Sequence, residues 1–141
     1  MENFFYSFEK KPETKSRFPY ERMLTILRFL LKKINPENLS LYNVPLDIHL
    51  LIKLILRIND ELNSEEVNEN YLESMFGDEE LRNFLQEMQR AEIHLDLAID
   101  FQNFLEKYLK ELEERQAGGS DFTREEIQLL NRLFQQHQQS R

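Results

Sequence analysis

The sequence predicts an all-α protein, and three observations carry this prediction. Three Gly and four Pro among 141 residues leave few of the tight turns that a sheet-rich fold requires. Apolar residues recur at spacings of three and four along most of the chain. The apolar runs end at residues that typically cap or stop helices. We expect about five helices in a single domain over residues 19–138, after an aromatic and basic arm (1–18) and before a frayed tail (139–141).

The composition narrows the classes of protein to consider. Apolar residues make up 40% and charged residues 31%, too apolar for a disordered chain and too polar for a membrane protein. The absence of cysteine excludes disulfide scaffolds and thiol nucleophiles. The net charge of −8 is uneven, since Lys and Arg outnumber Asp and Glu only in residues 1–57. Because no secretory signal or membrane-length apolar run is visible, we expect a cytoplasmic protein that does not contact membranes.

The first two helices are predicted over residues 19–34 and from about Pro45 to Leu62. Pro19 suits the first position of a helix, and Pro36 is a stop signal. The second helix is apolar over about two-thirds of its circumference, which is typical of a helix surrounded by neighbours. We therefore expect it to be the centre of the core. Its polar residues share one narrow strip: His49, Lys53, Arg57 and Asp60.

A short third helix and a long fourth helix are expected next. Asn63 and Glu66 resemble a capping pair for the third helix, and Gly77 suits the left-handed position that ends it. Asp78 can then cap the fourth helix. From residue 79 to 116 no Gly or Pro interrupts an apolar series whose mean spacing of about 3.5 is that of a coiled coil. Such a helix would be about 57 Å long, more than a compact fold of this size needs.

Residues 93–101 also alternate like a half-buried strand, but their flanks are strongly helical and favour a helix. Eight of the thirteen residues from Ile93 to Leu105 are apolar and spread widely around the helix axis. We therefore expect the long helix to cross the other helices in this stretch.

The last helix has the clearest local signal in the chain. Gly118 and Gly119 separate it from the long helix. Thr123 and Glu126 form a T-x-x-E capping box, with Phe122 and Ile127 at the spacing of a hydrophobic staple.

The apolar seam of the long helix suggests self-association. It continues almost to the end of that helix through Leu105, Tyr108, Leu109 and Leu112. Because the outer half of a 57 Å helix would project from the body, we expect two seams to bury each other in a homodimer. The alternative is that the last helix folds back and covers the seam with Ile127, Leu130 and Phe134.

A second candidate surface is the basic face of the first helix, through which a partner protein would bind. It comprises Arg22, Phe29, Lys32 and Lys33, with Arg28 beside them. An aromatic ring among cations can stack on a base or insert into a protein groove. The alternative is a solvated face, with Phe29 covered by the N-terminal arm. The arm carries four aromatic residues of its own, which favours either a strap over the core or a docking segment: Phe4, Phe5, Tyr6 and Phe8.

Signatures of catalysis or of a cofactor are absent from the sequence. No phosphate-binding, nucleophile-elbow, zinc-protease or calcium-loop motif is present, so we expect no enzyme activity, cofactor or metal. Glu92, Asp96 and Asp100 share one helical stripe that could hold a divalent ion if another helix added ligands. Such a stripe is more often a solvated face. His94 projects onto the apolar side of the helix, where a pH-sensing role is conceivable but a hydrogen-bonded core histidine is commoner.

The sequence thus favours a non-enzymatic helical module that binds another protein, such as an adaptor, a small chaperone or an inhibitor. The alternative is a small nucleic-acid-associated subunit that uses the basic first helix, although overall negative charge opposes binding to phosphates. A third hypothesis is a metal-dependent enzyme that uses the carboxylate stripe. Salt-dependent retention on a polyanion would favour the second hypothesis, and stabilisation by divalent ions the third.

Overall fold

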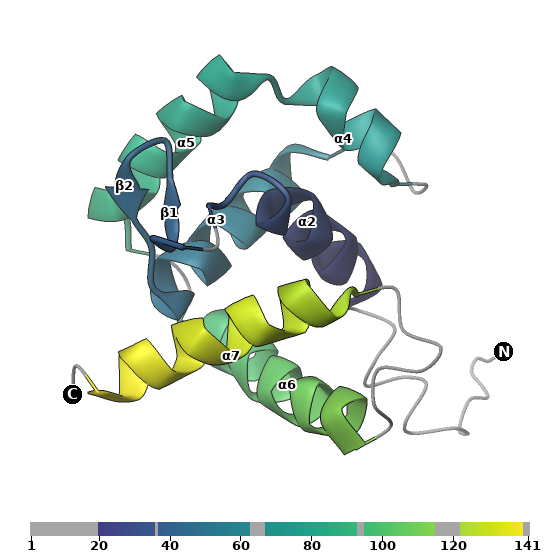
Figure 1. Ribbon diagram of the computed structural model, residues 1–141. Coiled ribbons are helices and arrows are strands. Elements are labelled where there is room, and N and C mark those ends of the chain that lie inside the picture. Colours follow the sequence, from purple (N-terminus) through teal and green to yellow (C-terminus); the bar gives the residue numbers. More distant parts are fainter. Residues whose placement is uncertain (1–19, 36, 63–66, 93–94, 115–121, 140–141) are drawn as a thin grey trace, which may run out of the picture.

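The computed structural model describes residues 20–35, 37–62, 67–92, 95–114 and 122–139, labelled as in Figure 1. The described residues form six helices and one short β-hairpin, so the fold is mostly helical, as the sequence predicts. The helices are α2 (Glu21–Leu31), α3 (Ile48–Glu61), α4 (Glu69–Met75), α5 (Asp78–Arg90), α6 (Leu95–Glu114) and α7 (Arg124–Gln139). The hairpin strands are β1 (Ser40–Leu41) and β2 (Val44–Pro45).

The helices form three layers, and α3 lies in the middle one (Figure 1). α2 and α3 lie in the middle, with α4 and α5 on one side and α6 and α7 on the other. α3 packs against α2, α5, α6 and α7, which confirms the prediction of a central second helix. Its apolar side chains are buried around most of the helix: Ile48, Leu51, Ile52, Leu54, Ile55, Leu56 and Ile58.

A β-hairpin separates α2 from α3, and the sequence analysis did not predict it. Ser40 pairs with Pro45 and Leu41 with Val44. The two turn residues, Tyr42 and Asn43, have φ values of 53° and 64°. Positive φ at both central positions is typical of the turn type that matches the twist of a two-stranded hairpin. Glycine, the usual signal for such a turn, is absent here.

Three helices begin at residues other than those predicted from the sequence. α3 begins after Asp47, whose side chain accepts a hydrogen bond from the Leu50 N–H at 2.8 Å, and Pro45 belongs to β2. Gly77 does not adopt the left-handed conformation, since its φ is −78°. It is instead the N-cap of α5, where its N–H donates to Glu80 Oε1 at 3.0 Å, and Asp78 is the first helical residue. The cap of α4 is Asn68, and the predicted pair Asn63 and Glu66 lies outside the described residues.

The single long helix predicted over 79–116 is wrong. α5 ends at Arg90, Ala91 has an extended backbone with ψ of 147°, and α6 begins at Leu95. A straight continuous helix could not lie in both outer layers. The break instead lets α5 and α6 pack against α3 from the two outer layers (Figure 1). Burial in the tertiary structure overrides local helix propensity here.

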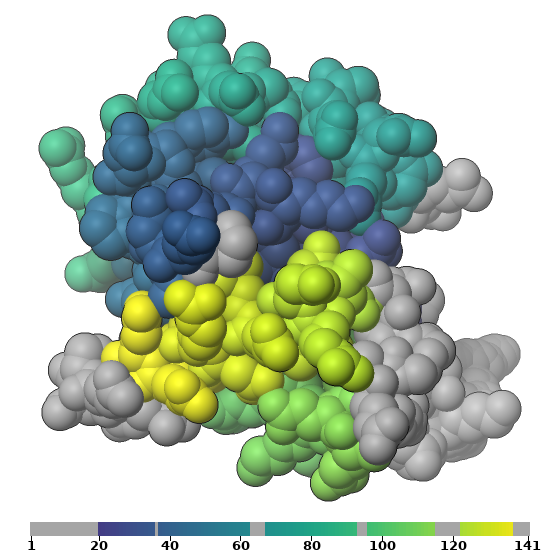
Figure 2. All heavy atoms as spheres, in the orientation of Figure 1, coloured from purple at the N-terminus to yellow at the C-terminus, as the bar shows by residue number. Residues whose placement is uncertain are grey.

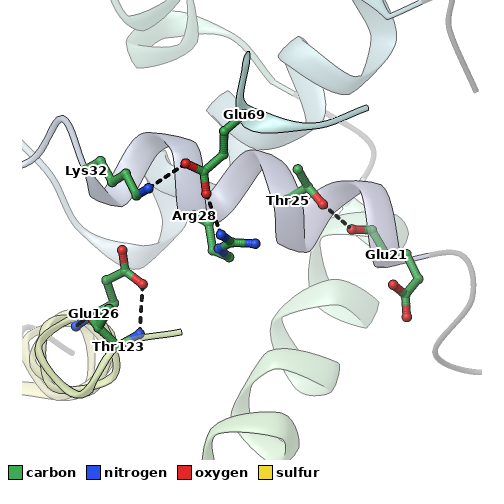
Figure 3. Close-up of polar contacts among 7 residues, drawn as sticks. All are labelled: Glu21, Thr25, Arg28, Lys32, Glu69, Thr123 and Glu126. Atoms are coloured by element: carbon green, nitrogen blue, oxygen red, sulfur yellow. Dashed lines mark hydrogen bonds and ion pairs between the residues drawn. The ribbon is translucent and has the colours of Figure 1, made fainter. Parts of the chain in front are cut away.

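The start of α7 agrees with its prediction. The Thr123 N–H donates to Glu126 Oε1 at 3.0 Å, and the Glu126 N–H donates to Thr123 Oγ1 at 3.1 Å. Phe122 and Ile127 are both buried, as a hydrophobic staple requires. The capping box is therefore confirmed, and Figure 3 shows its two side chains. Gly118 and Gly119 lie outside the described residues.

Candidate functional site

The basic face of α2 is engaged within the chain. Phe29 is only 1% exposed, so it cannot stack on a base or enter a partner's groove in this conformation, which corrects its assignment to the binding surface. The Lys33 ammonium lies 5.5 Å from the centre of its ring. Arg22 Nη2 donates to the Asn59 carbonyl oxygen in the last turn of α3 at 3.3 Å.

Glu69, the first residue of α4, joins α4 to the cations of α2 (Figure 3). Its carboxylate oxygens lie 2.6 Å from Arg28 Nη2 and 2.5 Å from Lys32 Nζ. A carboxylate is favoured at a helix N-terminus because the backbone dipole is positive there. Arg28 and Lys32 therefore join α2 to α4, and less of their charge remains for a phosphate backbone.

Lys33 belongs to a second polar cluster, between the hairpin and the start of α5. Tyr42 OH donates to Asp78 Oδ1 at 2.7 Å, Lys33 Nζ lies 3.7 Å from the same oxygen, and Arg82 lies over the Tyr42 ring at 4.9 Å. The hydrogen bond from Tyr42 lowers the pKa of Asp78, and Lys33 and Arg82 lower it further. Burial, followed by the interaction with Asp78, raises the pKa of Tyr42. The contacts of this cluster join the hairpin to the start of α5.

The polar strip of α3 is used to bind α5. Lys53 Nζ donates to the Ala91 carbonyl oxygen at 3.1 Å, which supplies a donor at the end of α5. Arg57 lies over the Phe84 ring at 4.5 Å and contacts Glu87 at 3.4 Å, and it also pairs with Glu61. These contacts between distant parts of the sequence hold the position at which α5 ends.

The apolar seam of α6 lies inside the chain. Leu105, Leu109 and Leu112 are each less than 5% exposed, and Tyr108 is half-buried. The folded-back α7 lies against α6, with Asn131 Nδ2 donating to Glu113 Oε2 at 2.5 Å and the Tyr108 and Phe122 rings 6.1 Å apart. In Figure 2 the atoms of α7 (yellow) lie against both the blue central layer and green α6. The seam is thus buried within the chain, with α7 folded back beside α6. Homodimer formation through it stays a prediction without the projecting helix that motivated it.

The first two turns of α6 are the least covered apolar part of the described chain. Leu97 is 42% exposed and Ile99 is 46% exposed, whereas Ala98 between them is buried. Met75 in α4 is the third large apolar side chain with comparable exposure among the described residues. The carboxylates of Asp96 and Asp100 are exposed on the same two turns. We call this set, Asp96, Leu97, Ile99 and Asp100, the α6 entry surface.

Leu97 and Ile99 lie at opposite edges of the buried stripe of α6. A helix turns about 100° per residue, which places Leu97 on the side of Phe104, one heptad further on. Ile99 lies on the side of Gln102. A pocket of about 340 Å³ lies beside Gln102, at the junction of α3 with the end of α5 and the start of α6. Its lining residues are His49, Ile52, Lys53, Ala91, Glu92, Ala98 and Gln102.

The edge marked by Leu97 continues into a row of aromatic rings. Tyr20 stacks on Phe104 with ring centres 4.5 Å apart and lies 5.6 Å from Phe101. Phe104 in turn stacks on Tyr108 at 5.8 Å. The row places the first described residue of the chain against α6, within two turns of Leu97. Burial and the nearby Asp100 carboxylate both raise the pKa of Tyr20.

The remaining chemical hypotheses gain no site from the described residues. Glu92, Asp96 and Asp100 are not gathered with other possible ligands into a group that could hold a metal ion within that part of the chain. His94 lies outside it. Among the described helices, none has both the length and the apolarity that crossing a membrane requires.

Comparison with protein-family models, with curated proteins and with solved structures finds no match to this chain.

The α6 entry surface was not predicted from the sequence, although a signal was present. The wide spread of apolar residues between 93 and 105 predicts more contacts than one buried stripe can provide. We interpreted it as a crossing within the chain. The structure buries one stripe of α6 and leaves Leu97 and Ile99 exposed at its edges.

Proposed function

We propose that this chain is a non-enzymatic protein-binding module and that the α6 entry surface contacts the partner. The observation that carries the proposal is the exposure of Leu97 and Ile99 within one turn of a helix. Single exposed apolar residues are ordinary. Leu97 and Ile99 instead border the exposed face of α6 on its two sides, and a pocket adjoins the Ile99 side, which together resemble an interaction site. The pocket adds a concave feature into which a partner side chain can insert.

Charge indicates the chemistry of the partner. Exposed carboxylates flank both apolar residues, from Asp96 and Asp100 on α6 and from Glu92 at the edge of the pocket. A complementary partner therefore presents apolar side chains between Lys or Arg residues. An amphipathic basic helix has this pattern, with anchors that enter an apolar groove at spacings of three and four.

A designed peptide with the chemistry expected of the partner tests the proposal. We would titrate the full chain with a fluorescent amphipathic peptide of Leu and Lys, and with a matched peptide in which Glu replaces Lys. We expect binding of the Lys peptide alone. Each apolar side chain buried on binding contributes on the order of 1–2 kcal/mol, so replacing both Leu97 and Ile99 by Ser should weaken binding at least about tenfold.

The matched control is Met75→Ser, which removes an apolar side chain of similar exposure on a different helix. It should leave the affinity for the Lys peptide unchanged. Equal affinities for the wild type, the double variant and the control would show that the peptide responds only to net negative charge, and the proposed surface would then be wrong.

A further inference from the structure

The first described residue, Tyr20, packs against α6, the helix that carries the α6 entry surface. Tyr20 stacks on Phe104 and contacts Phe101, and Leu97 lies one helical turn before Phe101. The rise along α6 from Phe101 back to Leu97 is about 6 Å. The point at which the described chain continues from residues 1–18 therefore lies close to Leu97.

The sequence of this N-terminal segment has the chemistry that the α6 entry surface lacks. Its aromatic cluster, Phe4 to Phe8, is followed by Lys10, Lys11, Lys15 and Arg17, and with its three Glu residues the segment carries one net positive charge. The surface presents the apolar side chain of Leu97 beside the carboxylates of Asp96 and Asp100, which share one side of the helix four residues apart. Apolar and charged groups on the two sides are thus complementary.

The tether is long enough for this contact. Eleven residues separate Phe8 from Tyr20, and the twelve peptide steps between them reach at most about 40 Å. A tether of this length gives its free end an effective concentration in the millimolar range at the site. Even a weak contact is then substantially occupied.

We propose that residues 1–18 bind in cis to the α6 entry surface, with the aromatic cluster against Leu97 and the lysines beside Asp96 and Asp100. The contact itself does not depend on the proposed function. Its consequence does, because the arm would compete with the partner for the same residues. A partner must displace the arm, so its apparent affinity is reduced by the fraction of molecules in which the arm is bound.

Site-specific crosslinking in the full chain tests the contact. The photoreactive residue p-benzoylphenylalanine would replace Leu97 in one protein and Met75 in a control. After irradiation and proteolysis, we expect peptides from residues 1–18 crosslinked to position 97 and none crosslinked to position 75. Absence of arm peptides at position 97 would overturn the proposal.

Isotope mixing separates a contact in cis from one between two chains. With equal amounts of ¹⁵N-labelled and unlabelled protein, a contact in cis gives crosslinks in which both peptides carry the same label. Mixed crosslinks in the statistical proportion would show that the arm binds a second copy, and the inference in cis would be wrong.

A binding measurement distinguishes failure of this inference from failure of the proposed function. Replacement of Phe4, Phe5, Tyr6 and Phe8 by Ser in the full chain should increase the affinity for the Lys peptide severalfold. If that affinity is unchanged while the Leu97 and Ile99 double variant still loses binding, the arm does not compete and the function stands. If position 97 crosslinks to the arm but no variant binds the peptide, the proposed function fails and the contact in cis stands.

Discussion

α3 and the start of α6 share one sequence property and differ in structure. Both are apolar around most of the helix, which predicts a helix surrounded by neighbours. α3 has those neighbours, because four other helices pack against it. The start of α6 buries Ala98 and Phe101 but leaves Leu97 42% and Ile99 46% exposed. The comparison shows that apolar patterning predicts how much coverage a helix needs, without saying whether the same domain supplies it.

The largest expected difference between the two regions concerns a charge introduced at an isoleucine. Ile55 in α3 is 0% exposed, so Ile55→Asp buries a carboxylate without a partner. The cost of several kcal/mol is comparable to the total stability of a domain, about 5–15 kcal/mol, and we expect the variant to be unfolded. Circular dichroism during thermal melting is the measurement.

Ile99→Asp is the matched control, because the same substitution is made at a residue that is 46% exposed. Its melting transition should remain cooperative and its free energy of unfolding should change by less than about 1 kcal/mol. A cooperative melt of Ile55→Asp, or loss of folding in Ile99→Asp, would reverse the comparison between α3 and α6.

A second prediction compares the two halves of α6. Leu105 is fully buried, so Leu105→Ala should lower the free energy of unfolding by about 2–5 kcal/mol. Ile99→Ala should change it by less than about 0.5 kcal/mol. Urea denaturation measures both values. Similar costs at the two positions would mean that Ile99 is covered in solution.

How far the sequence predicts this fold depends on how local each cause is. The Thr123 capping box involves side chains three residues apart, and it was predicted correctly. The burial of α3 follows from its own apolar pattern. The end of α5 at Ala91 could not be predicted, because the stabilising donor is Lys53, which is 38 residues away.

The candidate site was predicted less well for the same reason. Phe29 lies among basic residues in the sequence, and only the packing around α2 shows that it is buried. Lys32 gains its partner from Glu69, which lies 37 residues further along the chain. The exposure of Leu97 and Ile99 depends on which neighbours the fold leaves out, and helical periodicity carries no information about that.

A third prediction concerns the N-terminal cap of α7, the helix that folds back beside α6. Thr123→Ala removes the acceptor for the Glu126 N–H and should cost about 1 kcal/mol. We expect faster hydrogen exchange in α7, with the amides of α3 affected little. Thr25→Ala is the control, because Thr25 Oγ1 donates to the Glu21 carbonyl oxygen within α2 and caps no helix (Figure 3). Unchanged exchange in α7 of Thr123→Ala would show that packing alone holds the start of that helix.

The smallest expected effect comes from an exposed polar contact between the hairpin and α5, where no apolar coverage is at stake. The pKa of Asp78 is lower in the folded state, chiefly because Tyr42 donates a hydrogen bond to its carboxylate. A carboxyl group with a depressed folded pKa stabilises the fold above its unfolded pKa of about 3.9, and this stability is lost as pH falls through the folded pKa. Tyr42→Phe should therefore lower stability at neutral pH and reduce the loss of stability between neutral pH and strongly acidic pH. Urea denaturation at a series of pH values measures this change.

In an Asp78→Asn background, Tyr42→Phe should leave the pH dependence unchanged, because the titrating group is already absent. A change of pH dependence in that background would assign the effect to a group other than Asp78.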